Sequence, residues 1–266
     1  MNLPSITPKQ QEILELLYRY RFLDRIQIQT FMGHRDKRRI TSWLKDLRHK
    51  QYVEWIYSTD FEKKSKPATY YLGINSVRYL RGTGTYPLTE LRKRYKESGR
   101  SSSFITRSKI LADIAIELQV KSNDNKRYLC QPTAAYALPG SDFHFLTDFT
   151  AIHPDIVYVR QQDGTSRTYL IELIDATLPR YRVKRRLKVY VDLLDYEFDE
   201  WRQASSTTAR PTVLFICPSV GELLYAKRRT RKLLEDVPDR KDVHIKFKTI
   251  DKVRETGVIS GGWEEA

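Results

Sequence analysis

The sequence predicts a mixed α/β protein that begins with a winged helix-turn-helix domain. Two observations indicate this fold class. Early in the chain, short helical patterns are followed by a pair of strand-like runs, which is the order of elements in a winged helix. Later, helical patterns alternate with apolar strand-like runs, which is typical of a sheet covered by helices. We predict domains at residues 1–81 and 104–266, joined by a linker at 82–103 that contains a short basic helix.

The composition favours a nucleic-acid partner over a membrane. The 266 residues include 47 Lys and Arg against 33 Asp and Glu, a formal net charge of +14. Such an excess attracts polyanions, and we see no long apolar run, lipidation signal or signal peptide. We therefore expect a cytoplasmic DNA-binding protein in which Cys130 and Cys217 are reduced. Histidine and cysteine do not cluster in the sequence, so no zinc site is expected.

Capping residues predict where the first helices begin. Thr7 and Gln10 form a capping box around a proline at the first helical position. Asp24 and Gln27 can cap a second helix in the same way, and Gly33 ends it. A further helix, at 74–81, is expected to close this domain.

The third helix, which begins after Asp36, is the expected DNA-recognition helix. Its apolar stripe is formed by Ile40, Trp43, Leu44 and Leu47. The other faces are basic, with hydrogen-bonding residues between the charges, as in a helix that contacts DNA. The candidate DNA contacts on this helix are Lys37, Arg38, Arg39, Ser42, Lys45 and Arg48.

A lysine-rich wing is expected beside this helix. Paired strands are predicted at Tyr52–Ser58 and Ala68–Leu72, and the segment between them contains three further candidate DNA contacts, Lys63, Lys64 and Lys66. The first predicted domain holds twice as many Lys and Arg as Asp and Glu, as expected for a module that faces phosphates.

The second domain is predicted to alternate helices and strands. The segment before it, Leu88–Lys96, is very polar, and we interpret it as a solvated connecting helix. Asp113 and Glu117, one turn apart on the first helix of the domain, are expected to be surface residues. The predicted elements are a helix at 104–120, a strand at 128–131, an irregular or hairpin segment at 142–152, a hairpin, a long helix, a strand at 211–217, a helix at 220–235 and a strand at 243–249.

The hairpin of this domain carries the candidate metal site. Its strands are predicted at 155–159 and 167–175, on either side of a Gln-Asp-Gly-Thr turn. Because side chains alternate along a strand, Asp155 at the start of one strand and Glu172 near the end of the other can point at a common spot. Two carboxylates suit Mg²⁺ or Mn²⁺, bound weakly with waters completing the coordination shell.

The helix that follows, from Pro179 to about Arg202, is strongly basic. Its apolar residues recur at helical spacing and are expected to pack on the sheet. They are Val183, Leu187, Tyr190 and Leu194. Its cations form rows, because residues four apart share a face of a helix. We expect one row to flank the acid pair and the other to face solvent or DNA, the rows being Arg182 with Arg186 and Lys184 with Lys188.

These motifs resemble the plasmid replication-relaxation family, which places a winged helix ahead of a nuclease-like core. The matching stretches include 7–14, 21–28, His153-Pro-Asp155, Leu170-Ile-Glu172, 186–190, 213–219 and 249–253. The core resembles that of the PD-(D/E)XK nucleases. The resemblance therefore implies a restriction-endonuclease-like mixed sheet with flanking helices in the second domain.

The resemblance also implies roles for individual residues. The candidate catalytic residues are Asp155, Glu172, Lys184, Arg186 and Lys188, of which the two acids would hold the metal. The basic residue that the superfamily places two positions after the acid is Ile174 here, and the family's helix lysine falls nearest Arg186. Arginine is a poor proton acceptor. We therefore predict that Arg186 lies beside both carboxylates and neutralises them when no metal is bound.

Three functions are compatible with the sequence. The favoured one is a DNA-binding accessory protein of a mobile genetic element, acting in plasmid replication or transfer, with a nuclease-like core that binds DNA. The second is a Mg²⁺-dependent DNA endonuclease or nickase that uses Asp155 and Glu172, against which Ile174 argues. The third is a transcriptional repressor whose second domain only dimerises. The expected partners are double-stranded DNA, a relaxase or replication initiator, and a second copy of the chain.

Overall fold

The computed structural model describes residues 3–57, 67–120, 127–162, 165–205, 209–237 and 242–266. The chain divides into two compact units, the first formed by Met1–Ile116 with Ala137–Ser141 and the second by Glu117–Tyr136 with Asp142–Ala266. Within the described residues, no helix has the length and apolar composition needed to cross a membrane.

The helices at the start of the first unit begin at the predicted caps. They are α1 (Pro8–Tyr20), α2 (Arg25–Phe31) and α3 (Lys37–His49). Thr7 and Asp24 both form complete capping boxes, and Asp36 accepts a hydrogen bond from the Arg38 backbone N–H. These side chains satisfy backbone N–H groups that have no partner within the helix. The predicted starts of these helices are therefore confirmed.

A small antiparallel sheet follows, with the strand order β1-β3-β2. Its strands are β1 (Leu23–Asp24), β2 (Val53–Ile56) and β3 (Thr69–Leu72), and α4 (Ile74–Gly82) comes next. Gly73 is needed between β3 and α4, because a Cβ atom there would lie 2.6 Å from the Gln51 carbonyl oxygen. The strand pair β2–β3 was predicted, whereas β1 is too short to show in the sequence pattern.

The polar segment after α4 is not the solvated connector that its composition suggested. It forms α5 (Leu88–Arg94) and a 3-10 turn at Glu97–Gly99, and the Arg94 side chain is buried, with 2% of the residue exposed. Arg94 donates to the Tyr18 carbonyl oxygen at 3.0 Å, and Arg21 Nε lies 2.7 Å from the buried Glu97 carboxylate. A buried carboxylate needs such cationic partners, which explains why these arginines are directed into the unit.

The second unit is built on a mixed sheet with the strand order β4-β5-β6-β7-β8-β9. The antiparallel part comprises β4 (Arg127–Pro132), β5 (Ile156–Gln162) and β6 (Thr165–Leu173). The parallel part adds β7 (Thr212–Cys217) and β8 (Ile245–Thr249), and β9 (Glu264–Glu265) closes the edge. The predicted mixed α/β class is confirmed. The helix α6 (Ser102–Val120) precedes this sheet, and its residues from Glu117 onward belong to the second unit.

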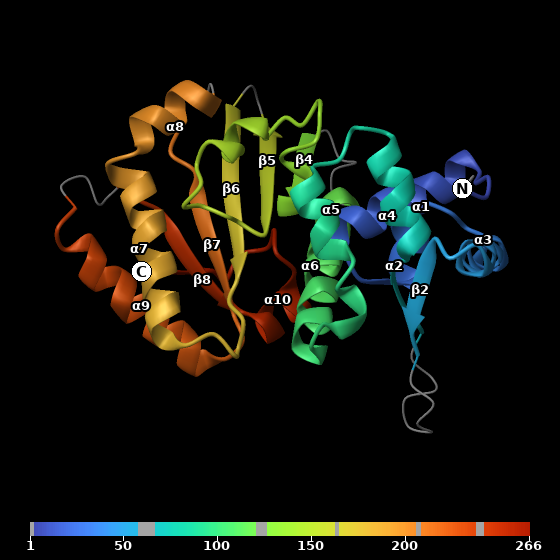
Figure 1. The fold of residues 1–266 in the computed structure, drawn as a ribbon. Helices are drawn as coiled ribbons and strands as arrows, with labels where there is room; N and C mark the ends of the chain where they lie inside the picture. Colours follow the sequence, from blue (N-terminus) through green and yellow to red (C-terminus); the bar gives the residue numbers. More distant parts are fainter. Residues whose placement is uncertain (1–2, 58–66, 121–126, 163–164, 206–208, 238–241) are drawn as a thin grey trace. The chain divides into compact units, whose positions relative to one another are not determined.

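Helices α7 (Arg180–Asp195) and α9 (Val220–Leu234) cover one face of this sheet (Figure 1). Leu187 and Leu194 from α7 and Leu223 from α9 are buried with Phe215 and Phe247 in one hydrophobic core. The predicted core-facing stripe of α7 is therefore confirmed. A short helix, α10 (Ile250–Thr256), follows β8 and was not predicted.

The predicted continuous helix from Pro179 to about Arg202 is wrong. The helix ends at Asp195, and a second helix, α8 (Phe198–Ser205), begins after a break at Tyr196, which is 78% exposed. Trp201 on α8 is fully buried and its ring lies 5.1 Å from that of Phe145. Burying this indole favours the break, since a buried aromatic ring removes a large apolar area from water.

Candidate functional site

Asp155 directly precedes β5, and Glu172 lies near the end of β6. The antiparallel register of the two strands ends with the pair Ile156 and Ile171, so the two acids lie at the same end of the hairpin. The Asp155 backbone N–H donates to the Ile171 carbonyl oxygen at 2.8 Å, and its Oδ2 accepts from the Leu173 N–H at 2.7 Å. The charges of both acids act on the same two buried hydroxyls, those of Tyr136 and Tyr190. The two acids therefore lie close together, as the sequence predicted.

Both carboxylate oxygens of Glu172 are bound by side chains of α7. Glu172 is buried, with 2% of the residue exposed. Its Oε1 forms an ion pair with Arg186 Nη1, and its Oε2 accepts a hydrogen bond from the Tyr190 hydroxyl at 3.0 Å. Arg186 and Tyr190 are four residues apart, so one face of α7 presents both donors to the acid. A charge-assisted pair and a hydroxyl donor compensate the cost of burying this carboxylate.

A second tyrosine completes a group that we call the acid cluster: Asp155, Glu172, Tyr136, Tyr190 and Arg186. Tyr136 is buried and its hydroxyl donates to the Pro154 carbonyl oxygen at 3.1 Å. Burial, followed by the charge of Asp155, raises the pKa of Tyr136 well above its ordinary value. Burial, followed by the charge of Glu172, does the same to the pKa of Tyr190. Both hydroxyls therefore stay protonated and act as hydrogen-bond donors.

The buried tyrosines predict a loss of stability at alkaline pH. In the folded protein the pKa of Tyr136 and Tyr190 lies well above 10.0, the value of an unperturbed tyrosine. As the pH rises, the unfolded chain therefore loses these protons before the folded protein does. The contribution of the two tyrosines to the free energy of unfolding is complete below about pH 10 and is lost as the pH rises above it. We expect the free energy of unfolding in urea to be lower at about pH 11 than at about pH 9, and less so in Tyr190→Phe. Equal values at the two pH points would contradict this.

The three candidate cations of α7 lie in different surroundings. Arg186 forms an ion pair with Glu172, one of the two carboxylates beside which it was predicted to lie. Lys188 instead pairs with Asp192 at 2.6 Å and is well exposed, and Lys184 is also exposed. Ile174 is buried after the end of β6, and Asp175 accepts from the Thr177 N–H and hydroxyl, both at 2.8 Å. Asp175 therefore forms a turn at the strand end.

The acid cluster does not fit a Mg²⁺ or Mn²⁺ ion in this arrangement. Such ions need several oxygen ligands that are not already engaged by cations. Each Glu172 oxygen accepts from an α7 donor, one of them a guanidinium that supplies the positive charge a metal would bring. In the part of the chain that the structure describes, no group of three or more His, Cys, Asp and Glu side chains could hold a metal ion.

The two acidic residues considered on α6 form hydrogen bonds with distant segments of the chain and lie outside the acid cluster. Asp113 accepts a hydrogen bond from Gln27 Nε2 at 2.6 Å within the first unit. Both oxygens of Glu117 accept from the Val258 backbone N–H, at 2.9 and 3.0 Å, within the second unit. Asp113 is exposed, as expected, and Glu117 is half-buried, but each of them also binds the backbone or side chain of a distant segment.

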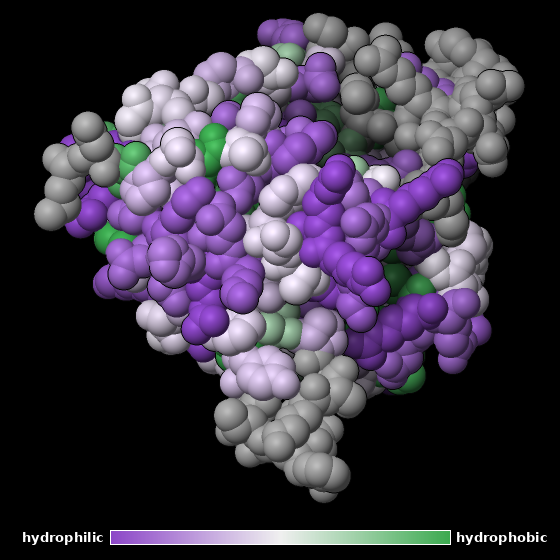
Figure 2. Space-filling view, turned by 90° about the vertical axis from the view of Figure 1, so that its right-hand side faces the viewer, coloured by the Kyte–Doolittle hydropathy of each residue, from purple (hydrophilic) through white to green (hydrophobic). Residues whose placement is uncertain are grey.

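The predicted DNA-binding face of α3 is exposed to solvent. Ile40, Leu44 and Leu47 are buried, which directs the basic faces outward. All six candidate contacts on the helix are exposed: Lys37, Arg38, Arg39, Ser42, Lys45 and Arg48. Helix α3 lies on the right-hand side of Figure 1, and the surface seen from that side is mostly hydrophilic (Figure 2). The three wing candidates, Lys63, Lys64 and Lys66, lie outside the described residues.

Aromatic side chains next to α3 were missed in the sequence. The Arg48 guanidinium lies 3.8 Å from the centroid of the Trp55 ring on β2, and Trp55 stacks on Tyr57 with centroids 5.7 Å apart. A cation–π contact of this kind holds a guanidinium in place while leaving its N–H edges available. In the acid cluster, the hydroxyl of Tyr190 was also missed, although its spacing from Arg186 could have indicated it.

Comparison with solved structures finds a weak likeness to a restriction endonuclease. Solved structures that are similar at low TM-score include the restriction endonuclease FokI (0.35, 14% identity) and FokI bound to DNA (0.32, 13% identity). Each match covers 94% of this chain but only 43% and 44% of the FokI chain, so this chain spans less than half of those proteins. That likeness is too weak to support an argument. No curated protein matches.

A family model described as replication-relaxation matches residues 14–208. The matched segment contains α3, the hairpin that carries Asp155 and Glu172, and the whole of α7. It extends over more than half of the chain. The chain therefore belongs to the replication-relaxation family.

Proposed function

We propose that this chain is a DNA-binding accessory protein of a mobile genetic element, acting in plasmid replication or transfer. In this proposal the first unit is a winged helix-turn-helix that binds double-stranded DNA through α3. The observation that supports it most is the exposure of every candidate contact on α3 while the apolar stripe of the same helix is buried. A relaxase or replication initiator and a second copy of the chain are the expected protein partners, in the cytoplasm.

The charges of α3 are available to phosphates because the acids of the helix are engaged elsewhere. Asp46 accepts hydrogen bonds from Lys50 and from Gln10 on α1, at 2.7 and 2.6 Å. Asp36 caps the helix at its start. Cations that meet phosphates release condensed counterions, which gives affinity without base recognition. Ser42, exposed among these cations, can hydrogen-bond to a phosphate or a base edge.

In the second unit, side chains of the protein already occupy the carboxylate oxygens of Glu172 in the acid cluster. We therefore assign this unit a role in binding DNA and not in cutting it. Arg186 provides a permanent positive charge at Glu172, and Tyr190 binds the other oxygen. A guanidinium stays protonated at physiological pH and is a poor proton acceptor. The cluster is therefore suited to stabilising the junction of β5, β6 and α7 and not to cleaving DNA.

Binding of duplex DNA over a range of salt concentrations tests the proposal. With three to five phosphate contacts from α3, the plot of log K against log salt should have a slope of about −2.7 to −4.5. A random duplex of about 20 base pairs and fluorescence anisotropy are sufficient, because this term does not depend on sequence. A protein that does not bind duplex DNA at low salt, or binds it with no salt dependence, would contradict the proposal.

A further inference from the structure

Two exposed aromatic rings lie beside the last turn of α3. Trp55 on β2 is 38% exposed and Tyr57, which follows the strand, is 46% exposed, and their rings stack with planes 24° apart. Val53, two residues before Trp55, is buried. Because side chains alternate along a strand, Val53 and Trp55 lie on one face, which leads from the core to the surface. Adjacent exposed rings of this kind mark a contact surface.

Arg48 of α3 lies over the first of these rings. Its guanidinium is 3.8 Å from the centroid of the Trp55 ring, and the residue is exposed. Trp55 in turn contacts its cross-strand partner on β3, the buried Tyr70, with centroids 6.2 Å apart. The ring beneath the guanidinium is therefore supported by the sheet. A guanidinium over a supported ring is held in place, while its N–H groups remain available at the edge.

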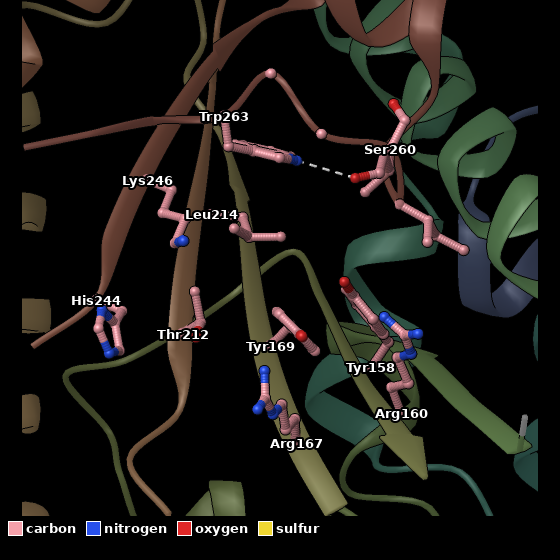
Figure 3. A pocket seen from close by; sticks show the side chains of 14 residues that line it. Tyr158, Arg160, Arg167, Tyr169, Thr212, Leu214, His244, Lys246, Ser260 and Trp263 are labelled. Atoms are coloured by element: carbon pink, nitrogen blue, oxygen red, sulfur yellow. Dashed lines mark hydrogen bonds between the residues drawn. The ribbon is translucent and has the colours of Figure 1, made fainter. Parts of the chain in front are cut away.

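Other cations that lie near aromatic rings are already used inside the protein. Arg210, which also lies over a ring, forms an ion pair with Asp242 at 3.3 Å. Lys248 is buried near the ring of Trp263, which lines a hollow of the second unit (Figure 3), and it donates to backbone carbonyl oxygens. Arg48 differs from both, because it is exposed and has no ion-pair partner within the part of the chain that the structure describes.

The position of Arg48 indicates what it contacts. It lies in the last turn of α3, and Lys45 is its exposed neighbour three residues earlier on the helix. In a recognition helix the N-terminal residues contact base edges, so the last turn lies near the phosphate backbone. The planar fork of a guanidinium matches a phosphate group, to which it donates two parallel hydrogen bonds.

We propose that Trp55 is a positioning residue that holds Arg48 ready for a bidentate contact with one phosphate of duplex DNA. This assignment rests on the proposed DNA-binding function and deepens it. An arginine side chain loses rotational freedom when it binds, and a contact already made in the free protein reduces that cost. The remaining candidate cations of α3 contact no aromatic ring among the described residues, so binding has to immobilise them fully.

Anisotropy with a random duplex of about 20 base pairs at about 0.1 M salt tests the proposal. Arg48→Gln should weaken binding about five- to tenfold and flatten the salt slope by about 0.9, because one phosphate contact is lost. Trp55→Leu should weaken binding about three- to fivefold and leave the slope unchanged, because the arginine remains but is no longer held. Trp55→Phe should retain most of the affinity, since it keeps a ring. In the Arg48→Gln background, Trp55→Leu should have no further effect.

Two more variants separate positioning from a change in the fold. Arg48→Lys leaves the ring in place and keeps the charge but not the planar fork, so it should also lower affinity without changing the slope. Tyr95→Leu, which removes another exposed ring of the first unit, is the matched control and should change neither quantity. Urea unfolding shows whether each variant is folded under the assay conditions.

A measurement without DNA tests the positioning itself. In the free protein, NMR relaxation of the Nε–H groups should show Arg48 to be more ordered than Arg38, and Trp55→Leu should remove the difference. Equal order of the two arginines in the wild type would overturn the proposal.

The binding results can also contradict it. An undiminished affinity of Trp55→Leu or Arg48→Lys would show that the ring does not position the arginine. An equal loss from Trp55→Leu with and without Arg48 would show that the ring acts by another route. A loss from Tyr95→Leu as large as that from Trp55→Leu would indicate a general effect of exposed rings. A wild type that does not bind the duplex contradicts the proposed function as well, whereas a wild type that binds it regardless of Trp55 contradicts the positioning role alone.

Discussion

Replacing Lys37, Arg38 and Lys45 by glutamine is expected to weaken duplex binding on the order of 10²-fold at about 0.1 M salt. Each phosphate contact contributes about 0.9 to the salt slope, so losing three should flatten it by about 2.7. All three side chains are exposed, and the α3 cap at Asp36 uses the Arg38 backbone, which glutamine retains. The free energy of unfolding should therefore stay within about 0.5 kcal/mol of the wild type.

A matched triple variant on another helix separates the α3 surface from net charge. Arg228, Arg231 and Lys232 are exposed on α9, and their replacement by glutamine removes the same charge. This control should retain its salt slope and most of its duplex affinity. If both triple variants lose affinity equally, α3 is not the recognition helix.

Arg186→Ala is expected to destabilise the protein by about 2 to 3 kcal/mol, a large share of the stability of an ordinary domain. The change leaves the buried carboxylate of Glu172 without its cation. Loss of one partner of a buried pair commonly costs more. The estimate is reduced here because the Arg186 side chain is 42% exposed, so solvent screens part of the interaction. Urea unfolding at neutral pH measures the effect.

Two further variants identify the cause of that loss. Arg185→Ala, at the neighbouring exposed position on α7, should cost less than about 0.5 kcal/mol. Arg186→Ala combined with Glu172→Gln should recover part of the lost stability, because the uncompensated buried charge is gone. A double variant less stable than Arg186→Ala alone would show that the carboxylate does not depend on the arginine.

The helix starts of the first unit could be predicted because capping residues act locally. Thr7, Asp24 and Asp36 each bond to backbone groups two or three residues away. The break between α7 and α8 could not be predicted in this way. It depends on Trp201 finding space against Phe145, a contact between segments far apart in sequence.

The candidate site also combines features that the sequence could predict with features that it could not. Strand alternation predicted that Asp155 and Glu172 lie close together, and helical spacing predicted that Arg186 reaches Glu172, as the shared tyrosine neighbours and the ion pair show. Whether the Glu172 oxygens would be available to a metal depends on the side-chain directions of α7, which spacing does not determine. Tyr136 comes from an irregular segment without periodicity.

Incubation of the protein with supercoiled plasmid and Mg²⁺ or Mn²⁺ tests the central claim, that the chain binds DNA and does not cut it. We expect the plasmid to migrate more slowly while the protein is bound and to be fully supercoiled after the protein is digested away. An Asp155→Ala/Glu172→Ala variant should give the same topology. Nicked or linear plasmid produced by the wild type and absent with this variant would contradict the account, because the acid cluster would then hold a metal and cleave DNA.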